Sequence, residues 1–174
     1  MRAALAQTLR TDVSVYRFHP AATIGVPLLA LFVQWFLPFK LHFMTWLDLP
    51  LLVTIFFAIS RREQVQGLMT GSVIGLLQDS LTNFPLGIYG LAKTLVGFFA
   101  SSLSVKIDSE NPGSRILITF GFFLLHQAVY FTVARKMVQL DLQWQWHQVL
   151  IAAVINALIA VPLFWVLDRL KQRG

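Results

Sequence analysis

The sequence contains no cysteine, and only 13% of its 174 residues are charged. Without cysteine, disulfide bonds and thiolate metal sites are excluded. Soluble domains carry roughly 25% charged residues, about twice the share found in this chain. Hydrophobic residues make up 56% of the chain and its mean hydropathy is +0.67. We therefore expect the chain to bury most of this apolar surface in lipid.

Acidic residues are also scarce, since 8 Asp and Glu stand against 14 Lys and Arg, which gives a net charge of +6. The basic residues lie between apolar blocks rather than on one basic face, which argues against binding of nucleic acid. A long apolar run near the start is missing too, because Arg2, Arg10 and Arg17 interrupt the first nineteen residues. We expect no cleavable signal peptide there.

Six apolar segments follow one another along the chain. A membrane-spanning helix needs ~20 predominantly apolar residues. The last three segments meet this length, whereas the second and third are short, with Asp48 and Pro50 interrupting the second. Six full spans are the favoured interpretation, and a re-entrant pair formed by the second and third segments is the alternative. The predicted spans are 21–39, 45–60, 65–81, 86–105, 116–134 and 147–167.

The distribution of basic residues predicts the orientation of these spans. Cytoplasmic loops of membrane proteins carry an excess of Lys and Arg, and tryptophans gather at the two membrane interfaces. With both termini in the cytoplasm, Lys40, Arg135 and Lys136 fall outside, and Trp165 falls at the inner end of the last span. The inner side then holds Arg2, Arg10, Arg17, Arg61, Arg62, Lys106, Arg115, Arg169, Lys171 and Arg173, and the outer ends hold Trp35, Trp46, Trp144 and Trp146.

The loops between the segments are short, so the sequence predicts one integral-membrane domain, 1–174, without a soluble domain. Within 1–19, apolar residues recur at helical spacing (Leu5, Leu9, Val13 and Tyr16) while arginines lie elsewhere on the wheel. This pattern is typical of an amphipathic helix on the inner leaflet. A frayed tail with positive topology signals is an equal alternative.

Glycines in the third and fourth segments form two stripes of small residues. Gly67, Gly71, Gly75 and Asp79 recur every four residues, and Gly90, Lys93, Gly97 and Ser101 follow at three- and four-residue spacing. Small residues let two helices approach closely within lipid. We expect the two segments to pack as an antiparallel hairpin, with ordinary packing favoured over contact with a partner protein. Leucine at Gly71 or Gly75 should separate the helices, whereas alanine should be nearly tolerated.

Charged residues within a span are costly unless they are paired or wetted. Asp79 and Lys93 both lie in the outer half of the predicted bundle, so a direct ion pair between them is the favoured interpretation. Contact with a partner protein is the second, and a proton path the third. His126 and Asn156 lie at similar depth and could join Lys93 in a polar cluster. A lone His or Asn within a span more often forms an interhelical hydrogen bond than acts as a ligand.

The sequence offers no pattern of catalysis or metal binding. No histidine pair has ligand spacing with a carboxylate, and no nucleophile–base motif or phosphate-binding glycine loop is present. We therefore expect no catalytic residue, no metal and no cofactor.

One stretch resembles the central signature of the MreD family. It runs from Gly67 through Asp79 to Leu81 and continues as Pro85-Leu-Gly87-Ile-Tyr-Gly90-Leu-Ala-Lys93, with a short polar turn between. Asn156 followed by Pro162 is similar to the family's last span. The resemblance implies a non-enzymatic scaffold of the rod-type cell-wall elongation machinery in the bacterial inner membrane.

The same resemblance implies partners and a fold. MreC is the expected partner. RodA with its transpeptidase partner, and also MreB, are expected as direct or indirect partners. A homodimer is a further alternative. The implied all-α fold, with six transmembrane helices, is similar to the substrate-binding subunits of energy-coupling-factor vitamin transporters. Such a subunit is the alternative function, although the short outer loops offer little to close over a ligand pocket.

Overall fold

The computed structural model describes residues 17–36, 45–82, 85–104 and 111–172. These residues form six α-helices, one π-helical turn (η3) that continues α6, and two short strands. The elements are β1 (Arg17–Phe18), α2 (Pro20–Phe36), α3 (Leu49–Arg61), α4 (Gln64–Thr82), α5 (Ile88–Ser104), α6 (Pro112–Thr132), η3 (Val133–Met137), α7 (Trp146–Asp168) and β2 (Lys171–Gln172).

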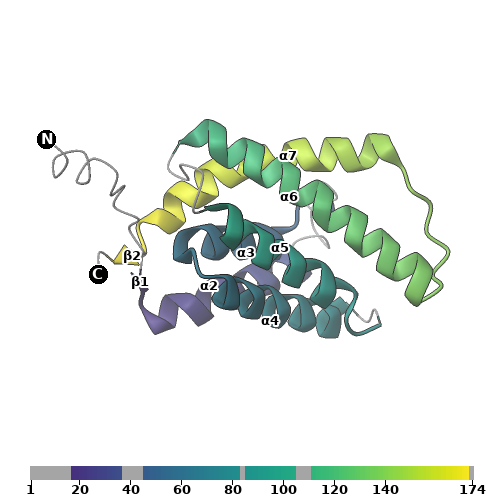
Figure 1. Ribbon diagram of the computed structural model, residues 1–174, viewed down its shortest axis with the longest axis horizontal. Helices are drawn as coiled ribbons and strands as arrows, with labels where there is room; N and C mark the ends of the chain where they lie inside the picture. The colour runs from purple at the N-terminus through teal and green to yellow at the C-terminus, as the bar shows by residue number, and fades with distance from the viewer. Residues whose placement is uncertain (1–16, 37–44, 83–84, 105–110, 173–174) are drawn as a thin grey trace, which may run out of the picture.

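The two strands place the start and the end of the described chain at the same end of the bundle. β1 pairs antiparallel with β2, with Arg17 opposite Gln172 and Phe18 opposite Lys171. This end is called the proximal end, and it lies to the left in Figure 1. The opposite, distal end holds the last residues of α2, α4 and α6 and the first residues of α3, α5 and α7.

The predicted segments correspond to the six α-helices, and in the described part of the chain two of these helices are both long and apolar enough to cross a membrane. Within the described residues, 112–137 and 146–168 have the length and hydropathy of spans, whereas α2 and α3 are apolar but shorter. The remaining two, α4 and α5, have 19 and 17 residues. The predicted helix at the N-terminus and the segments around Lys40 and Lys106 lie outside the described residues.

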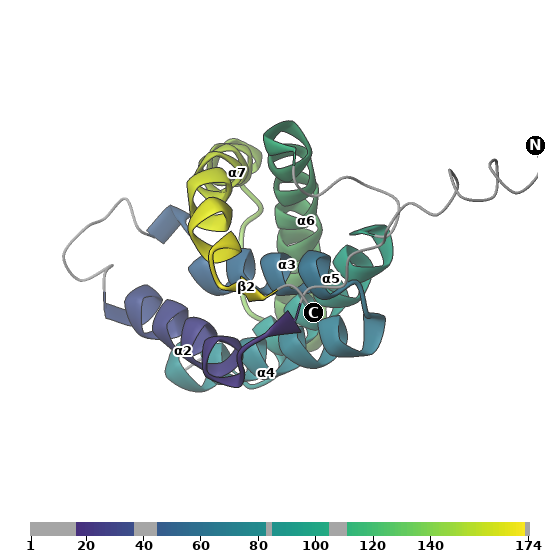
Figure 2. The same cartoon turned by 90° about the vertical axis from the view of Figure 1, so that its left-hand side faces the viewer.

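The central element of the fold is α3, in which every residue from Pro50 to Ser60 is buried. A helix that is apolar on all sides lies inside a bundle rather than on its surface. Figure 2 shows α6 and α7 on one side, α2 and α4 on the other, and α3 and α5 between them. The fully buried rings of Phe56 and Phe164 join α3 to α7, with their centroids 5.4 Å apart.

The closest helix pair is the α4–α5 hairpin, in which glycines face the backbone of the neighbouring helix. A Cβ atom on Gly71 would overlap the carbonyl of Lys93, and one on Gly75 would lie 2.5 Å from the Tyr89 oxygen and 2.7 Å from the Gly90 Cα. Gly67 and Gly97 approach each other in the same way. The expectation that alanine is tolerated at Gly71 and Gly75 is therefore wrong, because a rigid backbone occupies the space.

The other two glycines of the hairpin differ in their surroundings. A Cβ on Gly90 would lie 3.0 Å from Leu76 Cδ2, which is a side chain that can shift. Gly87 has a φ of +105° and no neighbour within 4 Å of the place its Cβ would occupy. The turn into α5 thus requires glycine at position 87 for its backbone conformation rather than for packing.

Ion pairs join α6, α7 and the following strand at the proximal end. Arg115 Nη2 lies 2.6 Å from Asp168 Oδ2, and Lys171 Nζ lies 2.7 Å from Asp168 Oδ1. Arg61, at the end of α3, donates a hydrogen bond to Thr23 of α2. Basic side chains from α3, α6 and β2 therefore gather at the end where the described chain starts and finishes.

Candidate functional site

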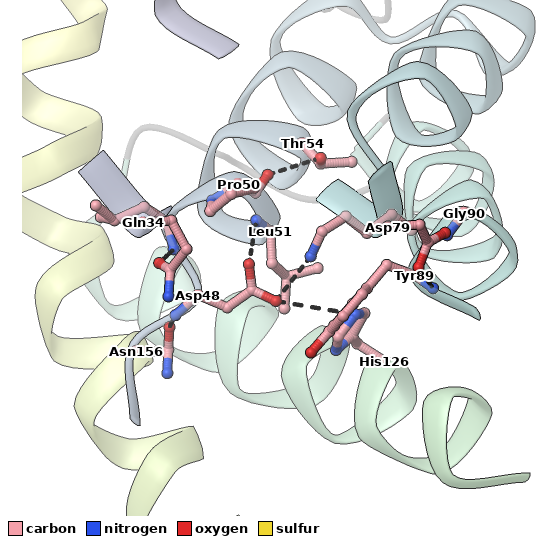
Figure 3. A network of polar contacts seen from close by, with 12 residues as sticks. Gln34, Asp48, Pro50, Leu51, Thr54, Asp79, Tyr89, Gly90, His126 and Asn156 are labelled. Carbon is pink, nitrogen blue, oxygen red and sulfur yellow. Dashed lines mark hydrogen bonds and ion pairs between the residues drawn. The ribbon is translucent and has the colours of Figure 1, made fainter. Parts of the chain in front are cut away.

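A polar network surrounds the first turn of α3, at the distal end of the bundle (Figure 3). The first N–H groups of a helix have no partner within the helix, and in lipid they cannot turn to water. Pro50 has no N–H, and the Leu51 N–H donates to Oδ1 of Asp48, the N-cap residue. The Leu49 N–H donates to Gln34 of α2, at 3.0 Å. Side chains thus replace water at this helix end.

Asn156 connects α7 to the segment that precedes α3. Its Oδ1 accepts a hydrogen bond from the Asp48 N–H, and its Nδ2 donates to the carbonyls of Trp46, at 2.7 Å, and Ala152, at 2.8 Å. The side chain is completely buried. Every polar atom of this amide is therefore used, and the contacts fix α7 against the start of α3.

Lys93 forms an ion pair with Asp48 rather than with Asp79. Lys93 Nζ donates to Asp48 Oδ2 at 2.7 Å, and the lysine side chain is fully buried. The ammonium group also lies 5.4 Å from the centre of the Tyr89 ring. The predicted pair of Asp79 with Lys93 is wrong, because a carboxylate 45 positions earlier in the chain lies nearer to the lysine.

Asp79 binds the first turn of α5. Its Oδ2 accepts hydrogen bonds from the N–H groups of Gly87 and Gly90, at 2.9 and 3.0 Å, and its Oδ1 accepts one from Tyr89, at 3.0 Å. A carboxylate at a helix N-terminus satisfies unpaired donors and interacts favourably with the helix dipole. Asp79 and Asp48 therefore have the same role, each at the N-terminus of a helix that begins at the distal end.

His126 is the fourth member of the network that surrounds Asp48. Its side chain is 2% exposed, its ring stacks on Tyr89 and Tyr130, and its Nε2 lies 3.9 Å from Asp48 Oδ2. Within the described residues, neither ring nitrogen has a hydrogen-bond partner. The structure thus brings Lys93, His126 and Asn156 together around Asp48, while Asp79 lies apart at the start of α5.

Asp48 is the residue that the sequence interpretation missed as a functional position. In the sequence it interrupts an apolar segment, although Asp48-Leu49-Pro50 has the form of a helix start, with an aspartate at the N-cap and a proline two residues later, within the first turn. That signal would have placed a carboxylate at the outer end of a span. A search for the partner of Lys93 would then have included it.

A cavity of about 410 Å³ adjoins this network at the distal end. Asp48 and His126 contribute to its wall, together with residues of α2, α4, α6, α7 and the segment that leads into α7. Within the described residues, no group of three or more His, Asp and Glu side chains is placed to hold a metal ion. The network consists of one ion pair, capped helix ends and an unpartnered imidazole.

A family model described as rod shape-determining protein MreD matches residues 15–173. The chain belongs to the MreD family. The match covers almost the whole chain, so the resemblance seen in the central signature is confirmed, and with it a role in determining rod shape. The MreD signature residues between Gly67 and Lys93 are those that form the α4–α5 hairpin. Comparisons with curated proteins and with solved structures give no match.

Proposed function

We propose that this MreD-family chain is a non-enzymatic scaffold of the rod-type cell-wall elongation complex in the bacterial inner membrane. Membership of a membrane-protein family that determines rod shape supports this proposal and is the observation on which it rests. MreC is the proposed direct partner. RodA with its transpeptidase partner and MreB are proposed to be connected to this chain directly or through MreC.

The arrangement of the helices supports a multi-pass topology with both termini in the cytoplasm. Both ends of the described chain meet at the proximal end through β1 and β2, as an even number of crossings requires. Arg61, Arg115 and Lys171 lie at that end, in agreement with the excess of positive charge on cytoplasmic sides. Shorter helices such as α3 can be accommodated by local thinning of the bilayer or by enclosure within the bundle.

The polar groups inside the bundle support a structural role. Asp48, Asp79 and Asn156 hold the first turns of α3 and α5, and Lys93 neutralises Asp48. Asp48 and Asp79 accept hydrogen bonds from helix N–H groups, so protonation of either carboxylate would weaken the helix start that it caps. We therefore propose that they keep the bundle rigid so that its outer faces can receive partner helices.

The outer faces of the helices are suited to contact with lipid and with other transmembrane helices. On α4, opposite to the glycine stripe, the exposed side chains are large and apolar, among them Val65, Met69 and Val73. The outward sides of α2 and α7 are similar, with Leu29, Phe32, Leu158 and others. A single-span partner such as MreC is proposed to pack against one of these faces.

Purification of the tagged chain from native membranes at its natural expression level tests this proposal. Mass spectrometry of both proteins and small molecules in the eluate should find MreC in comparable amount. A photo-reactive residue at Val73, Phe32 or Leu158 should then crosslink to MreC from one face and not from the others. Absence of MreC from a folded, membrane-inserted sample would contradict the scaffold proposal.

The alternative function, a vitamin-binding subunit of an energy-coupling-factor transporter, is favoured by one observation, the distal cavity. It predicts a vitamin bound in equal amount and co-purification of the transporter's energising subunits instead of MreC. The same mass spectrometry experiment distinguishes the two functions.

A further inference from the structure

The distal cavity has an unusual lining for a membrane protein. It lies where six helices begin or end, next to the Asp48–Lys93 pair, and it includes residues of the segment that leads into α7. Six of the eleven glutamines of the chain line it, namely Gln34, Gln78, Gln127, Gln143, Gln145 and Gln148. Each amide offers two donors and an acceptor. A cavity of this size falls in the range of small-molecule sites, about 300–1,000 Å³.

Several polar atoms in the cavity wall lack a partner. Both ring nitrogens of His126, Oε1 of Gln78 and Nε1 of Trp144 are buried without a hydrogen bond within the described residues. His126 and Gln78 are 2% and 6% exposed. A buried polar group without a hydrogen bond destabilises the protein unless water or a ligand supplies the partner. Two helices and the loop before α7 thus contribute residues with unpartnered polar atoms to the wall of one cavity.

The formal charges around the cavity cancel. Asp48 is the one carboxylate among the lining residues that the structure describes, and Lys93 neutralises it at 2.7 Å. No lysine or arginine is among the described lining residues, so this part of the wall offers no counter-charge to a phosphate or a carboxylate. A charged ligand would have to give up its hydration without compensation. The chemistry of the site therefore favours an uncharged ligand.

Aromatic rings supply the second kind of contact. The same cavity is lined by five aromatic residues whose rings have flat apolar faces, namely Trp46, Tyr89, Tyr130, Phe131 and Trp144. A sugar ring has C–H groups on its faces and hydroxyl groups at its edge, so it can stack on aromatic rings while amides bind its hydroxyls. We propose that the distal cavity binds a neutral, polyhydroxylated ring, either a soluble sugar or the sugar headgroup of a glycolipid. This site is independent of the proposed binding of MreC.

Isothermal titration calorimetry on the full chain in lipid nanodiscs tests the proposal. The protein is purified without glucoside or maltoside detergents, whose headgroups would compete. One arm adds methyl β-D-glucopyranoside, and a second compares nanodiscs with and without a monoglucosyl diacylglycerol, read as a shift in thermal unfolding. Binding of the free glycoside indicates a soluble source, and a response to the glucolipid alone indicates a headgroup. Glucose 6-phosphate serves as the charged control and should bind at least tenfold more weakly.

Two substitutions, one of nearly equal volume and one that keeps an aromatic ring, link the binding to the cavity. Gln78→Met removes the amide whose oxygen has no partner, and Trp144→Phe removes the indole N–H while keeping an aromatic face. Each should weaken binding roughly 3- to 10-fold, the effect of one hydrogen bond. The matched controls are Gln64→Met, at the proximal start of the same helix, and Trp165→Phe, exposed at the proximal end of α7. These controls should bind as the unmodified chain does.

Three results would overturn the proposal. The first is no response of the folded protein to either probe at roughly 10 mM, well beyond a millimolar dissociation constant. The second is binding of glucose 6-phosphate as tight as that of the neutral glycoside, which would indicate recognition of an anion. The third is equal weakening by the cavity variants and the proximal controls, which would place the bound sugar elsewhere.

Discussion

Two carboxylates in this chain, Asp48 and Asp79, each lie at the N-terminus of a helix that starts at the distal end. Asp48 has a second role, because it neutralises the fully buried Lys93. Removal of one member of a buried pair leaves an uncompensated charge and typically destabilises a protein by ~3–5 kcal/mol, whereas removal of both is much less costly. The pair is therefore best tested by changing its members separately and together.

Asp48→Asn and Lys93→Met should each lower the thermal stability of the purified protein, and the double variant should recover part of the loss. Asparagine caps a helix about as well as aspartate, so the first change mainly affects the charge. Residues in contact typically couple by ~0.5–3 kcal/mol in a double-mutant cycle. The matched control is the cycle of Asp79→Asn with Lys93→Met, in which the coupling should be smaller. A larger coupling in the control cycle would show that Lys93 pairs with Asp79 after all.

Asp79 should matter through its three hydrogen bonds to the start of α5. Asp79→Ala removes both acceptor oxygens, and with them all three hydrogen bonds, and should destabilise the protein by about 3 kcal/mol or more, since hydrogen bonds to a charged group contribute ~1.5–3 kcal/mol each. Asp79→Asn keeps one acceptor and should have an intermediate effect in the same thermal unfolding measurement. If the alanine variant were as stable as the unmodified chain, this result would contradict the capping role of Asp79.

The sequence predicts which polar residues are buried better than it predicts their partners. Asp79, Lys93, His126 and Asn156 stand out because each interrupts an apolar segment, and all four are buried. Their partners depend on how α3 is enclosed by the other helices. Asp48 looks like a break between segments in the sequence, and its proximity to Lys93 arises only when α3 and α5 lie side by side in the middle of the bundle.

At the scale of elements, the α4–α5 hairpin follows closely from the sequence. Four-residue spacing of glycine predicts a close approach of two helices, and the glycines of α4 do face the backbone of α5. Spacing alone did not reveal how close this approach is, and the tolerance of alanine was misjudged for that reason. The enclosure of α3 is not predictable from the sequence, because a mostly apolar helix can face either lipid or other helices, and its residues do not identify the neighbours that surround it.

Alanine in the glycine stripe tests this close approach. Gly71→Ala and Gly75→Ala should each lower stability by ~1–3 kcal/mol through overpacking against the backbone of α5. Gly25→Ala in α2 and Gly121→Ala in α6 are matched controls, because nothing lies within 4 Å of the added Cβ at either position. These controls should be neutral or stabilising by up to about 1 kcal/mol, the difference in helix propensity. Equal effects at all four positions would contradict the packing.

At the scale of the whole molecule, the chain is a bundle whose two ends differ in chemistry. The proximal end gathers basic side chains and both ends of the described chain, and the distal end holds the capped helix starts and the amide-rich cavity. The predicted orientation, with both termini in the cytoplasm, places the proximal end at the cytoplasmic side of the membrane.

Single cysteines in this cysteine-free chain test the orientation. Cysteine at Gln143, which is exposed before α7, should react with an impermeant thiol reagent added to cells whose outer membrane is permeabilised and whose inner membrane is intact. Cysteine at Asn111, exposed at the start of α6, should react only after the inner membrane is permeabilised. Reaction of position 111 alone while the inner membrane is intact would indicate the opposite topology. Reaction of both positions would exclude six spans.

The central claim is that the buried polar groups serve the fold of a scaffold and perform no chemistry. The most direct measurement replaces the chromosomal copy with the Asp48→Asn/Lys93→Met double variant and records cell shape, together with the amount of MreC that co-purifies. At a membrane level equal to that of the unmodified chain, the account predicts rod-shaped cells and undiminished MreC. Round cells that contain a normally inserted, folded double variant with MreC still bound would contradict the account, since the ion pair would then carry a function beyond support of the fold.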